Sequence, residues 1–125
     1  MTKKLTNVSR PDKAESAIDA LTKAKALIIE KGWTQGALAR DDKGMVVSYH
    51  DPNATSYCML GAVAVAVKDD GACENVANEA LHAVVPGGIA MYNDKTGRRK
   101  ATVIKRFDEA IAALRALAPK EETNA

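Results

Sequence analysis

Three polar residue types in this sequence occur in the order that a cysteine-based catalytic site would use. Cys58 can serve as the nucleophile, His82 as the general base, and Asn93 or Asp94 as the group that orients the base. A thiol near the start of a helix experiences the positive end of the helix dipole, which lowers its pKa and favours the nucleophilic thiolate. One hypothesis is therefore a Cys58-dependent hydrolase or transferase.

The same cysteine also fits a purely structural position. Cys58 lies in the apolar segment 57–67, where a small buried thiol is an ordinary core residue. His82 follows Leu81 at the edge of the inward-facing side of its predicted helix. This placement favours a residue at the boundary of the core, and not a general base. Because three such residue types fall in this order by chance in many sequences, we keep catalysis as the alternative and predict a core role for Cys58.

A metal site is the other chemistry that cysteine and histidine can support. The available ligands are Cys58, Cys73, His50 and His82, and they lack the short paired spacing of zinc sites. The glycine-containing segment 86–89 has neither the spacing nor the strand–turn–helix context of a phosphate-binding loop. The sequence therefore predicts no metal and no cofactor.

Two short polar segments contain residues that suit recognition of another macromolecule. They are Trp33, Thr34 and Gln35 in the first segment and Tyr92, Asn93 and Asp94 in the second. Binding residues concentrate on loops that a rigid scaffold positions. If the flanking helices pack antiparallel, both loops share one end of the bundle. Asp94 would then cap the last helix or accept a hydrogen bond from the indole N–H of Trp33.

The densest positive charge in the chain lies between residues 98 and 106. It comprises Arg98, Arg99 and Lys100, followed by Lys105 and Arg106. A solvated helix face is the default interpretation, and a patch for phosphates or an acidic partner is the sharper one. The whole chain has 18 basic and 16 acidic residues, a net charge of +2, which is too balanced to indicate nucleic acid or an anionic membrane by itself.

Hydrophobic periodicity predicts four helices, which must position these residues. They run from Pro11 to about Gly32, over residues 57–67, over about 72–84, and from about Thr102 toward the charged tail. Residues 89–99 are predicted to form a polar loop. The segment 57–67 is apolar on every face, which predicts a helix at the centre of the bundle and leaves a buried strand as the alternative. Thr55 or Ser56 would cap it, and Gly61 marks a close backbone approach.

Length and composition indicate a compact, mostly α, single domain. The chain has 125 residues, of which 46% are hydrophobic and only 4% aromatic, and much of the apolar content is alanine. We predict a helical domain over residues 11–118, a flexible arm at 1–10 and a flexible tail at 119–125. The region 38–50 either forms a small β-hairpin or remains an extended loop, because residues 45–50 are β-prone.

The same totals predict a cytoplasmic protein. Cys58 and Cys73 have no disulfide framework around them, and the polar start of the chain lacks the apolar stretch of a signal peptide. The apolar part of the longest uncharged stretch, residues 57–67, is too short to span a bilayer. We therefore expect no membrane partner, and the sequence carries no signal for an oligomeric state.

Three motifs followed by an amphipathic helix resemble a known family. They are GWTQG at residues 32–36, YCMLGA at 57–62 and ND at 93–94. In this order they resemble domain of unknown function 6197, a set of short bacterial and phage proteins, over residues 14–113. Members often carry Trp at the position of Tyr92. The resemblance implies a bacterial or phage origin and brings no activity.

The leading hypothesis follows from these exclusions. We expect a small non-enzymatic helical protein that binds another macromolecule, most simply a protein, as a phage or mobile-element accessory factor. A Cys58-dependent hydrolase or transferase is the first alternative, and nucleic-acid binding through the basic patch at 98–106 is the second.

Overall fold

Helices make up most of the part of the chain that the computed structural model describes, residues 5–117. The elements are, in order, the 3-10 helix η1 (Pro11–Lys13), α1 (Ala14–Glu30), β1 (Ala39–Arg40), β2 (Ser56–Tyr57), α2 (Met59–Val67), α3 (Gly71–Val84), α4 (Ile89–Asp94) and α5 (Lys100–Leu117). The predicted mostly α fold with a small β element is confirmed. Residues 1–4 of the predicted arm and 118–125, which include the predicted tail, lie outside the described residues.

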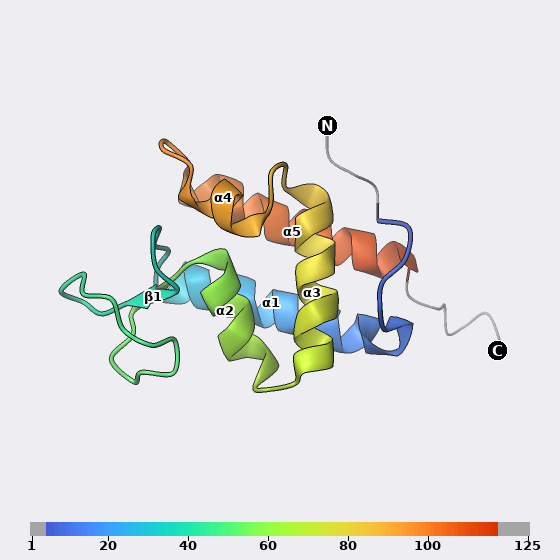
Figure 1. Cartoon of the computed structure of the whole chain (residues 1–125), viewed down its shortest axis with the longest axis horizontal. Coiled ribbons are helices and arrows are strands. Elements are labelled where there is room, and N and C mark those ends of the chain that lie inside the picture. Colours follow the sequence, from blue (N-terminus) through green and yellow to red (C-terminus); the bar gives the residue numbers. More distant parts are fainter. Residues whose placement is uncertain (1–4, 118–125) are drawn as a thin grey trace.

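Helix α1 lies at the centre of the bundle, in contact with α2, α3 and α5 (Figure 1). The sequence predicted this central place for residues 57–67. Helix α2 instead packs against α1, α3 and α4, and Leu60 and Ala64 on one of its sides remain partly exposed. Helix α2 has nine residues and α1 has 17, so α2 spans only about half the length of α1.

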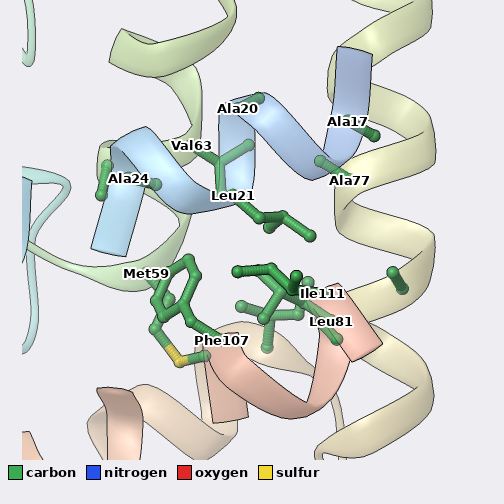
Figure 2. Close-up of a cluster of buried hydrophobic side chains, with 14 of the residues drawn as sticks. Ala17, Ala20, Leu21, Ala24, Met59, Val63, Ala77, Leu81, Phe107 and Ile111 are labelled. Atoms are coloured by element: carbon green, nitrogen blue, oxygen red, sulfur yellow. The ribbon is translucent and has the colours of Figure 1, made fainter. Parts of the chain in front are cut away.

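The core forms where four helices converge on one cluster of side chains (Figure 2). Its labelled members are Ala17, Ala20, Leu21 and Ala24 of α1, Met59 and Val63 of α2, Ala77 and Leu81 of α3, and Phe107 and Ile111 of α5. The alanines of α1 let neighbouring helices approach closely. Leu21, Leu81 and Phe107 are fully buried and fill the space between the helices.

The β element differs from the predicted hairpin in its second strand. Strand β1 pairs antiparallel with β2, which places Ala39 opposite Tyr57. The β-prone segment 45–50 contributes an isolated bridge between Val46 and Arg40, and a hydrogen bond from Val47 N–H to the carbonyl of Ala39 at 3.1 Å. The chain thus uses the residues just before α2 as its second strand and leaves 45–50 largely irregular.

Gly61 is the point where this sheet meets α2. A Cβ atom at position 61 would collide with the carbonyl oxygen of Leu38, so the predicted close backbone approach is confirmed. The predicted caps Thr55 and Ser56 are wrong, because β2 uses this part of the chain and the helix starts later. Cys58 is the N-cap, and its Sγ accepts a hydrogen bond from Gly61 N–H at 3.3 Å.

Residues 89–94 form the short helix α4, where the sequence predicted part of a loop. Gly88, with φ at 98°, turns the chain into this helix, and Ile89 and Tyr92 face the core. A helix of six residues contains too few apolar positions for a 3.6-residue period to appear in the sequence. Within residues 5–117, no helix is long and apolar enough to cross a membrane.

Candidate binding site

The two polar segments predicted from the sequence meet at one end of the bundle. The indole N–H of Trp33 donates to Asn93 Oδ1 at 2.8 Å, and Gln35 Nε2 donates to the carbonyl oxygen of Asn93 at 2.9 Å. The predicted proximity of the segments is confirmed. The predicted partner of the indole, Asp94, is wrong: Asn93 faces inward at the end of α4, while Asp94 is exposed.

Asn93 is the hub of this end of the molecule and is only 1% exposed. Its Oδ1 also accepts from the backbone N–H of Met59 at 3.1 Å, which satisfies a donor in the first turn of α2. Its Nδ2 donates to the carbonyl of Thr34 at 3.1 Å and to Asp94 Oδ1 at 2.9 Å. One carboxamide therefore joins the 33–36 segment, the start of α2 and the end of α4, with both of its donor hydrogens and its oxygen in use.

Asp94 completes the connection on the solvent side. Its Oδ1 accepts from Gly36 N–H at 2.9 Å as well as from Asn93 Nδ2. Gly36 has φ at 78°, a left-handed conformation that suits glycine. Within the described residues, Asp94 Oδ2 forms no hydrogen bond or ion pair, so one oxygen of a firmly held carboxylate remains available.

Arg40 supports the same segment from β1. Its Nε donates to Thr34 Oγ1 at 3.0 Å and its Nη2 donates to the carbonyl of Gln35 at 3.1 Å. Its Nη1 reaches the carbonyl of Gly44 at 3.0 Å. Sequence analysis did not single out Arg40, because these bonds join irregular loops whose approach no periodic pattern encodes. The guanidinium fork, with several N–H donors in fixed positions, explains why arginine suits this place.

A pocket of about 230 Å³ opens beside this network. Its apolar walls include Ala37, Leu38, Leu60 and Ala90, and its polar groups include Cys58 and Asp94. Leu38 is 44% exposed, and Met91, next to Ala90 on α4, is 74% exposed. Large apolar side chains therefore reach solvent at and next to a pocket whose rim is fixed by hydrogen bonds.

The thiol of Cys58 lies in this pocket but is poorly suited to act as a nucleophile. Cys58 is only 7% exposed. Burial raises the pKa of its thiol, and this outweighs the opposing hydrogen bonds from the N–H groups of Gly61 and Leu60, while the charge of Asp94 raises it further. The lowering expected from the start of the helix is thus overcome, because the site is desolvated and carries a nearby negative charge.

His82 does not share the pocket of Cys58 and Asp94. It is exposed on α3 and lines a separate groove of about 470 Å³ between that helix and residues 5–7, and the two pockets have no lining residue in common. His50 lies beside the ring of Tyr49, with 4.2 Å between ring centroids. Among the described residues, no three His, Cys, Asp or Glu side chains gather closely enough to hold a metal ion.

The basic residues of the 98–106 region are not one patch of equivalent charges. The guanidinium carbon of Arg98 lies 3.5 Å from the ring centroid of Tyr92, and its Nε donates to the Tyr92 carbonyl at 2.9 Å. Arg106 pairs with Glu109 at 2.6 Å. The remaining cations of the region are all exposed, and they are Arg99, Lys100 and Lys105. Two of the five charges therefore already have partners within the fold.

Comparison with protein families decides which family the chain represents. The family described as "Family of unknown function (DUF6197)" matches residues 12–113, which is most of the chain. The chain belongs to DUF6197. Comparisons with curated proteins and with solved structures gave no match.

The three motifs on which the resemblance to DUF6197 rested converge in this protein. Trp33 of the first motif and Met59 of the second both donate to Asn93 of the third, and Gly36 donates to Asp94. Segments separated by some 30 residues each thus form one hydrogen-bonded unit beside the pocket. The fold therefore gathers the three motifs that this chain shares with DUF6197 around one pocket.

Proposed function

We propose that this protein is a non-enzymatic helical module that binds another protein through the pocket beside Asn93 and Asp94. The observation that carries the proposal is an open, largely apolar pocket whose rim is held in place by hydrogen bonds from three separate segments. A role as a phage or mobile-element accessory factor in the cytoplasm belongs to the same proposal. It is supported by the resemblance to short bacterial and phage proteins.

A preformed rim favours binding because little order has to be imposed when the partner arrives. Each immobilised side chain costs roughly 0.5–1.5 kcal/mol when it is ordered only on association. Asn93, which lines the pocket, is already held by Trp33, Thr34 and Asp94 through hydrogen bonds of 2.8–3.1 Å. That cost is therefore already met in the free protein.

The exposed apolar side chains near the pocket supply the favourable contribution to the free energy of binding. Leu38 and Met91 are exposed, and Leu60 is partly exposed on α2. Covering such side chains contributes about 25 cal/mol for each Å² of apolar surface removed from water. A partner that places an apolar side chain between α2, α4 and the 36–38 segment would cover Leu38 and Leu60, which both line the pocket.

Photo-crosslinking tests the proposal directly. Benzoylphenylalanine replaces Met91, which is 74% exposed on α4 next to the pocket-lining Ala90, in the full-length chain produced in its native host. We expect a discrete adduct with one protein, and we expect Ala37→Arg in the same chain to abolish it. The matched control carries the crosslinker at Ala112, exposed on α5. Identical adducts from both positions, or none from position 91, would contradict the proposal.

The enzymatic and nucleic-acid alternatives receive less support. The thiol of Cys58 has a raised pKa, and His82 lines a different groove. Of the cations at 98–106, Arg98 and Arg106 have partners within the fold. We therefore do not extend the proposal to a Cys58-dependent hydrolase or transferase or to nucleic-acid binding.

A further inference from the structure

The pocket carries a negative charge that the fold orients but does not neutralise. Asp94 Oδ1 accepts two hydrogen bonds, from Gly36 N–H and Asn93 Nδ2, both at 2.9 Å. These two donors fix the plane of the carboxylate. Its Oδ2 has no partner among the described residues, so a cation that approaches it meets an acceptor that is already positioned.

The neighbouring basic side chains do not form an ion pair with Asp94 within the described residues. Arg98 stacks on Tyr92 and bonds its carbonyl, and Arg40 bonds three groups of the loops. Lys95 follows Asp94 directly but is exposed, and within residues 5–117 it forms no ion pair with it. Asp94 is the charged residue that lines the pocket. The lining of the pocket therefore carries one negative charge, on Asp94, and no positive charge.

The size and lining of the pocket indicate how much of a partner enters it. Pockets for drug-sized ligands measure about 300–1,000 Å³. This pocket measures about 230 Å³, and its walls include Ala37, Leu60 and Ala90. One leucine- or methionine-sized side chain fits that space and lining, whereas a large cofactor does not.

We infer that the pocket binds a short segment of a partner protein that inserts one apolar side chain and places a lysine or arginine beside Asp94. The apolar side chain contacts Leu38, Leu60 and Ala90, and the cation donates to Asp94 Oδ2. This inference rests on the proposed function and adds the chemistry of the occupant. Charge complementarity is what selects a basic segment over a neutral or acidic one.

A displayed library of random dodecapeptides, selected on the immobilised full-length chain, tests this inference. We expect the enriched peptides to share an apolar residue close to a lysine or arginine. Asp94→Asn should weaken their binding roughly tenfold, because it removes a charge-assisted hydrogen bond. This variant keeps an oxygen for Gly36 N–H and Asn93 Nδ2, and its thermal unfolding should match that of the parent. Asp42→Asn, the same change at an exposed loop residue, should leave binding unaltered.

A pocket-blocking variant separates this inference from the proposed function. Ala90→Trp fills the pocket from the exposed side of α4 and should abolish binding of the enriched peptides. Neutral or acidic peptides that Ala90→Trp blocks and Asp94→Asn leaves unaffected would overturn the basic occupant while the pocket remained a protein-binding site. A selection that yields no peptide sensitive to Ala90→Trp would overturn both.

Discussion

At the scale of single residues, one carboxamide holds the candidate site together. Asn93→Ala leaves the indole N–H of Trp33 and the backbone N–H of Met59 without their acceptor. Unsatisfied buried donors cost about 1–3 kcal/mol each, so for two donors we expect a loss of about 2–6 kcal/mol in the free energy of unfolding, measured with urea. Trp33→Phe removes only the indole donor and should cost about 1 kcal/mol. An Asn93→Ala protein as stable as the parent would contradict this role.

The thiol of Cys58 gives a second test at the residue scale. Because burial raises its pKa, the thiolate should form at higher pH than in an unfolded chain. We expect iodoacetamide to alkylate native Cys58 slowly at neutral pH and faster as the pH rises, as followed by mass spectrometry. A Cys73→Ser background isolates this thiol, and the urea-unfolded protein provides the reference rate. Rapid labelling of the native protein at acidic pH would instead favour the catalytic hypothesis.

At the scale of elements, the contact between α2 and Leu38, the residue just before β1, depends on the absence of a side chain at position 61. Gly61→Ala places a methyl group against the carbonyl oxygen of Leu38, so the 36–38 segment and α2 must separate. Overpacking of this kind typically costs about 1–3 kcal/mol, and we expect that loss in urea unfolding. Gly71→Ala is the matched control, because no atom lies within 4 Å of its added Cβ. Equal stability of the two variants would show that the interface is not tight.

The elements also show what could be predicted from the sequence. Long amphipathic segments were identifiable because the period of 3.6 repeats several times in α1, α3 and α5. Strand β2 and helix α4 were missed, since two and six residues respectively are too few to show a period. The proximity of Trp33 to the Asn93–Asp94 pair followed from antiparallel helix packing. The sequence did not predict correctly which residue of this pair accepts the hydrogen bond from the indole N–H. That choice is set by the helical phase of α4, and the sequence did not predict this helix.

At the scale of the whole molecule, the antiparallel course of α1 and α5 sets where the pocket lies. In Figure 1, α1 runs toward β1, whereas α5 starts near α4 and ends beside η1. The 36–38 segment, the start of α2 and the end of α4 therefore gather at one end, and η1 and the end of α5 lie at the other. A partner bound at the pocket would meet the ends of elements and not a helix face.

The distribution of charge over the molecule leads to the last prediction. Within residues 98–106, three cations remain exposed: Arg99, Lys100 and Lys105. If they contacted phosphates, binding to nucleic acid would weaken about 40-fold between 50 and 200 mM salt. Since the net charge is only +2, we expect no binding of a labelled DNA or RNA oligonucleotide in fluorescence anisotropy even at low salt. Two results together would establish the nucleic-acid alternative. Binding would show that salt dependence and be lost when all three cations become glutamine, and it would be retained in Asp94→Asn. The function would then lie at the start of α5.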